Sequence, residues 1–264
     1  MKSVYKQLDK ETALKLVRAH SWHHDWEIIP GVRTNGSYDP TVIWPQLQLP
    51  EDMTGITLAD VGASSGYFSF EANRRGAEVD AFDYRHSDNS GFGLAQHING
   101  MYDVDHHHVN ILDSIDWCTM GYYQVVLCMG LLYHTPDPYK ALVNCAYLAG
   151  KRLIVESYCA DNTGLAVGCA IPAMVFLSDP YRFPGRGQPN DDRSNFWCFT
   201  STCLRLMVED IGFSVDRCEV IGQRVLLDCH RVEQKTRVAE LGYDVMPRLA
   251  CGEDKDDPAS WRIF

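Results

Sequence analysis

The sequence predicts an α/β fold in which a doubly wound, mostly parallel sheet of seven strands ends in an antiparallel hairpin. Two observations support this class. Between residues 57 and 158, strand-like runs rich in Val, Leu and Ile alternate with helical patterns, which is typical of parallel βαβ units with both faces covered. Beyond residue 200, one helical pattern precedes two strand patterns separated by a short turn, which predicts the antiparallel pair.

The composition is typical of a globular protein with a full core, because 45% of the 264 residues are hydrophobic and 22% are charged. No apolar run approaches the roughly 18 residues that a membrane helix needs. The N-terminal stretch MKSVYKQLDKETALKLV lacks an apolar signal core. We therefore expect a cytoplasmic protein without a membrane partner, as a monomer or a homodimer.

The net charge weighs against a large nucleic-acid substrate. It is −11 at pH 7, whereas a protein that binds a phosphate backbone usually presents a basic face. No dense Lys/Arg cluster occurs in the sequence. A small-molecule partner is favoured and tRNA is disfavoured, although the total charge is compatible with a local basic patch.

The cysteine and histidine patterns predict no metal site. The ten cysteines never occur as CxxC, which favours reduced thiols over disulfides or metal ligands. Five of them lie in apolar runs and are expected in the core: Cys128, Cys145, Cys159, Cys218 and Cys229. Consecutive histidines at 106–108 would point to opposite faces of a strand, so they would not converge on one ion.

An N-terminal cap is expected over residues 1–50. A helical pattern covers residues 5–20, and the following stretch SWHHDWEIIPGVRTNGSYDP is rich in aromatic, histidine and turn residues, which is unusual for a linker. The core domain should then span residues 51–232, with an acidic, solvated tail over 233–264.

The elements of the core follow from the apolar pattern. Strands are expected at Thr57–Ala63, Glu78–Tyr84, His107–Ile111, Gln124–Met129 and Arg152–Tyr158. Helices are expected between the first two strands, between the second and third, and before the fifth, at Tyr67–Arg75, Gly91–Asn99 and Pro138–Leu148.

A lid insertion is expected after the fifth strand, over residues 159–198. So long a segment without regular structure is uncommon unless it is functional or disordered, and its many aromatic residues argue against disorder. A helix at Ser201–Ile211 and an antiparallel pair at Ser214–Ile221 and Arg224–Arg231 complete the predicted fold.

The turn DVGASSG after the first strand carries the strongest chemical signal. Gly62 and Gly66 let the backbone approach a ligand at a helix N-terminus, and Asp83 follows about 20 residues later, where an acid accepts hydrogen bonds from ribose hydroxyls. Ser64 stands where the dinucleotide fingerprint GxGxxG has glycine, which favours S-adenosylmethionine (SAM) over NAD. A plain βα turn is the alternative, and the order of turn, helix, strand and acid disfavours it.

Several stretches resemble one enzyme family. LADVGASSGYFSFEANRRGAEVDAFDY is similar to motifs I and II of class I SAM-dependent methyltransferases, and most similar to the bacterial tRNA wobble-uridine (5-hydroxyuridine) carboxymethyl- and methyltransferases. VVLCMGLLYHTPDPYKAL, NFWCFTSTCLRLMVEDIGF and SWHH…GVRTNGSYD resemble further motifs of that group. The resemblance extends over residues 15–230 and implies a Rossmann-like fold.

The resemblance implies a SAM site, with S-adenosylhomocysteine (SAH) as the product. The cofactor contacts expected from it and from the glycine turn are Asp60, Gly62, Ala63, Ser64, Gly66, Asp83, Tyr84, Asn110, Ile111 and Met129. Asp83 would hold the ribose, Asn110 and Ile111 would flank the adenine, and Met129 would lie near the sulfonium.

Tyr133 and His134 are the candidate catalytic residues. The resemblance implies that Tyr133 faces the acceptor. His134 follows the fourth strand, where doubly wound folds place ligands, and a histidine with a pKa near neutrality suits a general base; a role as loop anchor is the alternative. Trp22, Asn195 and Trp197 are candidates for lining the acceptor pocket, with ordinary packing as their alternative.

The expected function is SAM-dependent methyl transfer to an O, N or S atom of a small molecule. Carboxymethyl-transferring members carry a lysine-containing N-terminal pattern, whereas this chain has VRTNGSYDP with Arg33 as the nearby cation, which favours plain SAM. A tRNA wobble-uridine methyl- or carboxymethyltransferase and a non-catalytic SAM-binding regulatory protein are the alternatives.

Overall fold

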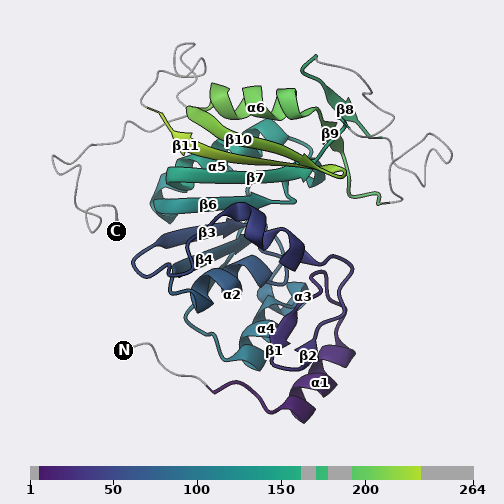
Figure 1. Ribbon diagram of the computed structural model, residues 1–264. Helices are drawn as coiled ribbons and strands as arrows, with labels where there is room; N and C mark the ends of the chain where they lie inside the picture. Colours follow the sequence, from purple (N-terminus) through teal and green to yellow (C-terminus); the bar gives the residue numbers. More distant parts are fainter. Residues whose placement is uncertain (1–5, 162–170, 178–191, 233–264) are drawn as a thin grey trace. The chain divides into compact units, whose positions relative to one another are not determined.

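The computed structural model describes residues 6–161, 171–177 and 192–232 (Figure 1). The chain divides into two compact units, Met1–Asp113 and Ser114–Phe264. Each unit has its own set of strands. The structure has a seven-stranded, mostly parallel sheet with a C-terminal antiparallel pair, so the predicted fold class is confirmed.

The first unit is built on three parallel strands in the order β3-β4-β5. Their bounds are Thr57–Val61 for β3, Glu78–Asp83 for β4 and Asp105–His108 for β5. Helix α2 (Tyr67–Arg74) packs on β3 and β4, while α3 (Ser87–Ser90) and α4 (Phe92–Asn99) connect β4 to β5. This arrangement places the glycine turn between the carboxyl end of β3 and the first turn of α2.

The cap also belongs to the first unit. It contains α1 (Lys10–Ala19), a hairpin of β1 (Glu27–Ile29) and β2 (Val32–Arg33), and the 3-10 helices η1 (Pro40–Val42) and η2 (Trp44–Leu47). Helix α1 begins at Lys10 because the Asp9 carboxylate accepts the N–H of Thr12 at 3.0 Å, as an N-cap residue does.

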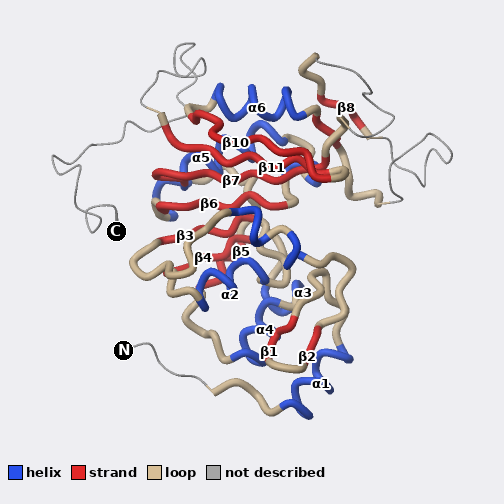
Figure 2. The backbone as a smooth tube through the Cα atoms, viewed as in Figure 1, coloured by secondary structure: helices blue, strands red, loops and turns tan. Residues whose placement is uncertain are grey.

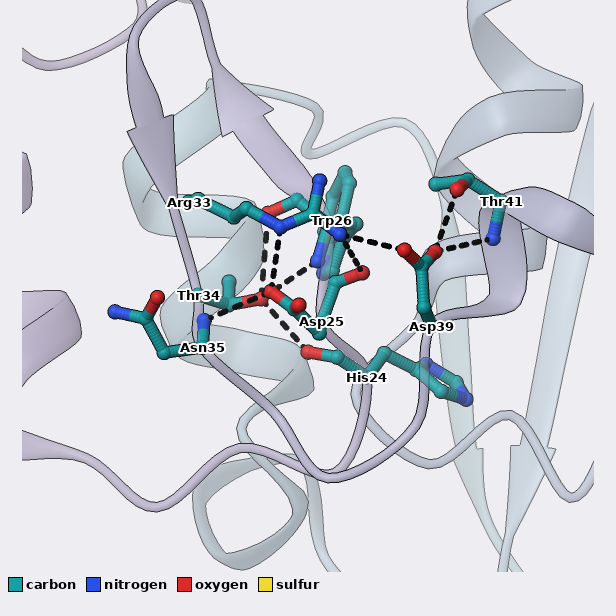
Figure 3. A network of polar contacts seen from close by, with 8 residues as sticks. All are labelled: His24, Asp25, Trp26, Arg33, Thr34, Asn35, Asp39 and Thr41. Carbon is teal, nitrogen blue, oxygen red and sulfur yellow. Dashed lines mark hydrogen bonds and ion pairs between the residues drawn. The ribbon is translucent and has the colours of Figure 1, made fainter.

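A polar network closes the cap loop onto itself (Figure 3). The Arg33 guanidinium lies between two carboxylates, 2.8 Å from Asp25 and 2.7 Å from Asp39. The Thr34 hydroxyl donates a hydrogen bond to the carbonyl oxygen of His24 at 2.7 Å. The loop, although rich in turn residues, is therefore held in one conformation by ion pairs and hydrogen bonds.

Four strands of the second unit pair in the order β10-β11-β7-β6 (Figure 2). Their bounds are Tyr123–Met129 for β6, Ala149–Tyr158 for β7, Phe213–Ile221 for β10 and Arg224–Arg231 for β11. Strands β6 and β7 are parallel, whereas β11 is antiparallel to both β7 and β10. Helix α5 (Pro138–Leu148) packs on β6 and β7, and α6 (Ser201–Asp210) packs on β10 and β11.

Four shorter elements complete the description of the second unit. The 3-10 helices η3 (Trp117–Met120) and η4 (Leu132–His134) flank β6. Strands β8 (Met174–Phe176) and β9 (Trp197–Phe199) pair antiparallel within the expected lid segment. The rest of that segment, 162–170 and 178–191, lies outside the described residues, as do residues 1–5 and the expected tail 233–264.

Two sequence predictions about individual elements are wrong. The strand predicted at His107–Ile111 ends at His108, because the side chain of Asn110 accepts the N–H of Leu112 at 2.9 Å and forms a turn there. Cys218, expected in the core, is exposed on β10, which is an edge strand with one neighbour. The other four cysteines of that group are buried, and all five are free thiols.

Among the described residues, no helix is both long and apolar enough to cross a membrane.

Candidate functional site

The glycine turn of the first unit has an unusual backbone. Gly62, Ser64 and Gly66 all have positive φ angles, of 84°, 53° and 87°. A left-handed conformation costs a residue with a side chain roughly 1–2 kcal/mol. Ser64 is held in it by two hydrogen bonds, because its N–H donates to Asp83 at 2.8 Å and its hydroxyl accepts from Arg85 at 3.0 Å. The position where the dinucleotide fingerprint has glycine thus keeps a glycine-like backbone.

Asp83 joins the end of β4 to this turn. Its side chain is 4% exposed, and its two oxygens accept the N–H of Ser64 at 2.8 Å and the N–H of Arg85 at 2.7 Å. Each carboxylate oxygen has two lone pairs, so the group retains acceptor capacity. The motif therefore fixes both the carboxylate and the loop beside it.

Asp60, the last acid of β3, is also buried. It accepts a hydrogen bond from the hydroxyl of Ser69 in α2 at 2.6 Å. Burial raises the pKa of Asp60 to about 7, and the nearby Asp83 adds to the rise. The first unit therefore places two carboxylates beneath one glycine turn.

The other cofactor candidates of the first unit differ in exposure. Ala63 and Ile111 are buried, whereas Tyr84 is 64% exposed. Asn110 is exposed and uses its side-chain oxygen in the turn that ends β5. Met129 belongs to the second unit, at the end of β6.

Trp22 is buried in the cap. Its indole N–H donates to the carbonyl oxygen of Val17 in α1 at 3.0 Å, and its ring lies over Gly91 before α4. Its role as a pocket residue stays a prediction. Within the first unit, the indole ring packs at Gly91 and its N–H is hydrogen-bonded to Val17.

His24 connects the cap directly to the glycine turn, which sequence reasoning missed. Its ring Nδ1 accepts the N–H of Tyr67, the first residue of α2, at 3.4 Å. Its backbone N–H donates to the hydroxyl of Ser65 at 3.2 Å. The repeated aromatic and histidine residues before residue 30 were a signal for this contact, but their partner could not be read from the sequence.

We expect His24 to make the protein less stable in mild acid. Burial holds the pKa of this imidazole well below its ordinary value, whereas in the unfolded chain it takes up a proton near pH 6.5. The contribution of His24 to the free energy of unfolding is fully present above about pH 6.5. It declines as the pH falls below that value, and the loss is about 1.4 kcal/mol at pH 5.5. Urea unfolding at pH 7.5 and 5.5 measures the loss.

The matched variant is His24→Asn, which keeps an acceptor for the Tyr67 N–H and does not titrate. Its free energy of unfolding should change less between the two pH values than that of the wild type. An equal change in both proteins would contradict the role of His24.

A buried ion pair lies at the carboxyl end of β6 and β7 in the second unit. The carboxylate of the buried Glu156 pairs with the guanidinium of Arg224. Arg224 also donates to the Tyr133 hydroxyl at 2.9 Å, and its guanidinium carbon lies 4.8 Å from the centre of the Tyr133 ring. The Tyr133 hydroxyl accepts in this contact, so its own proton can be donated to another group.

Sequence reasoning identified Tyr133 but missed Glu156 and Arg224. An acid and an arginine within the apolar runs LIVESY and GQRVLL were the available signal, because charged residues are seldom buried without a partner. Burial raises the pKa of Tyr133, so the phenol stays protonated near neutral pH.

His134 lies beside Tyr133, with their ring centres 4.1 Å apart. Its Nδ1 atom contacts the carbonyl oxygen and the hydroxyl of Ser194 at 3.2 and 3.0 Å. Burial lowers the pKa of His134, so the ring is neutral at pH 7.

The second unit brings four of the predicted residues together. The segment that carries Asn195 and Trp197 runs beside Tyr133 and His134, because the N–H of Phe196 donates to the Tyr133 carbonyl oxygen at 2.8 Å. Asn195 is buried, and the Trp197 indole packs against Phe176 of β8. Pocket lining by Asn195 and Trp197 stays a prediction.

The three histidines of β5 point to different partners. His107 pairs with Asp80 at 2.8 Å, His108 contacts the carbonyl oxygen of Tyr84 at 3.0 Å, and His106 packs against Phe92. Within the described ranges, no three His, Cys, Asp or Glu side chains are arranged to hold a metal ion.

Comparison with models of protein families and with curated protein sequences returns no match. Solved structures do resemble the chain. The N-terminal domain of EvdMO1 with SAH bound is 17% identical, with a TM-score of 0.56 over 86% of this chain and 98% of that chain.

Two further structures cover 73% of this chain, each with a TM-score of 0.51. One is magnesium protoporphyrin IX methyltransferase from Synechocystis PCC 6803 with bound SAH, which is 20% identical and covered over 80% of its length. The other is Burkholderia thailandensis 1,6-didemethyltoxoflavin-N1-methyltransferase with bound 1,6-didemethyltoxoflavin and SAH, which is 14% identical and covered over 76% of its length. The chain therefore has the Rossmann-like fold that these methyltransferases share.

Proposed function

We propose that this protein is a SAM-dependent methyltransferase that methylates an O, N or S atom of a small molecule. The observation that carries the proposal is the left-handed turn from Gly62 to Gly66, which is hydrogen-bonded to the Asp83 carboxylate. A glycine turn at a helix N-terminus with an acid at the end of the next strand suits an adenosine cofactor. The solved structures of similar fold with bound SAH support the same cofactor.

The residues divide into a donor group and an acceptor group. In the donor group, Asp83 would accept hydrogen bonds from the ribose, and the turn at Gly62 and Gly66 would approach the methionine moiety. Asn110 and Ile111 would flank the adenine. The other proposed donor contacts are Asp60, Ala63, Ser64, Tyr84 and Met129.

The transfer itself is an in-line displacement. Bound SAM would supply the methyl group: a lone pair of the acceptor atom would form the new bond to the methyl carbon while the carbon–sulfur electrons return to sulfur, which would leave SAH. The acceptor proton passes to the Nε2 atom of His134, which later releases it to water. Tyr133 would donate a hydrogen bond to the acceptor. Alignment of the two reactants contributes most to such a reaction.

A small-molecule acceptor agrees with the charge of the chain. The net charge of −11 disfavours a polyanion. The neighbours from Synechocystis and Burkholderia are, by their names, methyltransferases of magnesium protoporphyrin IX and of 1,6-didemethyltoxoflavin. An aromatic segment beside Tyr133, with Phe176 and Trp197 in contact, suits an apolar acceptor.

We expect Asp83→Ala to weaken SAH binding about 10- to 100-fold, because hydrogen bonds to a charged group contribute about 1.5–3 kcal/mol. Isothermal titration calorimetry with SAH measures the change, and thermal unfolding without ligand shows whether the variant folds. Asp83→Asn keeps one acceptor oxygen, so its affinity for SAH should lie between those of the wild type and Asp83→Ala.

Asp80→Ala is the matched control, because Asp80 lies on the same strand and its carboxylate binds His107. Its affinity for SAH should equal that of the wild type. Unchanged affinity in Asp83→Ala would refute the placement of the ribose. No heat and no thermal shift with SAM or SAH in the wild type would refute the function.

A tRNA wobble-uridine methyl- or carboxymethyltransferase is the second candidate, favoured by the resemblance of Met129–Pro138 to that group. Titration of tRNA at several salt concentrations separates the two proposals. A methyltransferase of small molecules should bind tRNA weakly. Tight tRNA binding that falls steeply with salt would favour the second candidate.

A further inference from the structure

We propose that Ser194 and Asp192 are positioning residues that fix His134 as the Nδ1–H tautomer and leave the lone pair of Nε2 as the base for the acceptor proton. This inference rests on the proposed function, because it assigns the proton of the methyl acceptor to a specified atom. Neither Ser194 nor Asp192 was singled out by sequence reasoning.

The directions of the hydrogen bonds determine the tautomer. The carbonyl oxygen of Ser194 can only accept, and it lies 3.2 Å from Nδ1 of His134, so Nδ1 carries the proton. The Ser194 hydroxyl donates to Asp192 at 2.6 Å. Its oxygen therefore faces Nδ1, 3.0 Å away, as a second acceptor. A neutral imidazole with hydrogen on Nδ1 has its lone pair on Nε2.

The segment that carries these acceptors is tied to the same loop as His134. The N–H of Phe196 donates to the carbonyl oxygen of Tyr133, and the indole N–H of Trp197 donates to the carbonyl oxygen of Pro136 at 3.4 Å. The N–H of Ser194 also donates to the Asp192 carboxylate, at 2.8 Å. The position of Ser194 against His134 is thus set on both sides of the contact.

The charges around the ring keep it neutral. Burial is the main effect that lowers the pKa of His134, and Arg224 lowers it further. The hydrogen bond from Ser194 and the negative charge of Asp192 raise it. The neighbouring Tyr133 ring stays uncharged, because burial raises the pKa of that phenol. The net pKa lies below the ordinary value of histidine, so the Nε2 lone pair is available at pH 7.

Nitrogen NMR of the full chain with labelled histidine tests the proposal, with His134→Gln used to assign the signal. We expect a protonated Nδ1 and an unprotonated Nε2 in the neutral ring of His134. Asp192→Asn removes a negative charge that raises the pKa of His134, so that pKa should fall in the variant.

Asp216→Asn is the matched control. It removes the same charge beside a different histidine, the exposed His230, which Asp216 contacts at 2.8 Å, and it should leave His134 unchanged. Ser194→Ala should weaken the preference for the Nδ1–H form, and Ser194→Thr should restore it, because threonine keeps the hydroxyl.

A neutral ring with its proton on Nε2 in the wild type would overturn the inference. An unchanged His134 pKa in Asp192→Asn would also overturn it. These outcomes are independent of the proposed function, which fails if the same wild-type sample binds neither SAM nor SAH in calorimetry.

Discussion

Gly66→Ala is expected to destabilise the first unit by about 2–5 kcal/mol and to abolish detectable SAH binding. A Cβ atom at this position would lie 2.4 Å from the Phe70 ring and 2.8 Å from the Phe92 ring. Both rings are fully buried, so neither can move aside freely in a close-packed core. The positive φ angle of 87° adds backbone strain. Urea unfolding and calorimetry with SAH measure the two effects.

Gly55→Ala separates the steric effect from the backbone strain. Gly55 lies in the same unit, has a φ of 79°, and has no atom within 4 Å of the place that a Cβ would take. Its substitution should cost about 1–2 kcal/mol and leave SAH binding intact. Equal losses in the two variants would show that the rings do not restrict Gly66.

Glu156→Ala is expected to destabilise the second unit by about 3 kcal/mol. Removing one partner of a buried ion pair leaves the other charge without compensation in the interior. Arg224 is 26% exposed and Glu156 only 2%, so water can relieve part of the remaining charge. Urea unfolding measures the loss, and the double variant Glu156→Met/Arg224→Met should be more stable than Glu156→Ala.

An exposed ion pair provides the comparison. Glu209→Ala in α6 breaks the contact with Arg205, 2.9 Å long between partly exposed side chains, and should cost less than about 1 kcal/mol. A similarly small cost for Glu156→Ala would show that the buried pair does not stabilise the unit.

The parts of the fold that repeat a pattern could be predicted from the sequence. Helix α5 spans Pro138–Leu148 as predicted, because Asp137 caps it and a proline begins it. Strands β3, β4 and β7 were also predicted, because at least half of the residues in each are apolar. Strand pairs as short as β1–β2 and β8–β9 show no periodicity, because a strand of two or three residues completes barely one alternation.

The candidate site was predicted only where its residues are close in sequence. The turn from Gly62 to Gly66 is read directly, and Tyr133 and His134 are adjacent. The contacts that orient them are distant, since Arg224 lies 91 residues from Tyr133 and Ser194 lies 60 residues from His134. Pairing at such separations depends on strand order and on the path of a loop, which local patterns do not encode.

The contact between His24 and the first turn of α2 has a consequence for how such a chain can diverge. A surface loop that contacts only the substrate can be exchanged or lengthened as new substrate specificities arise. Here the loop also supplies the acceptor for a helix N-terminus beside the glycine turn. The cap and the turn should therefore be inherited as one piece, and a chimera that grafts a foreign cap must also bring its own partner for the N–H of Tyr67.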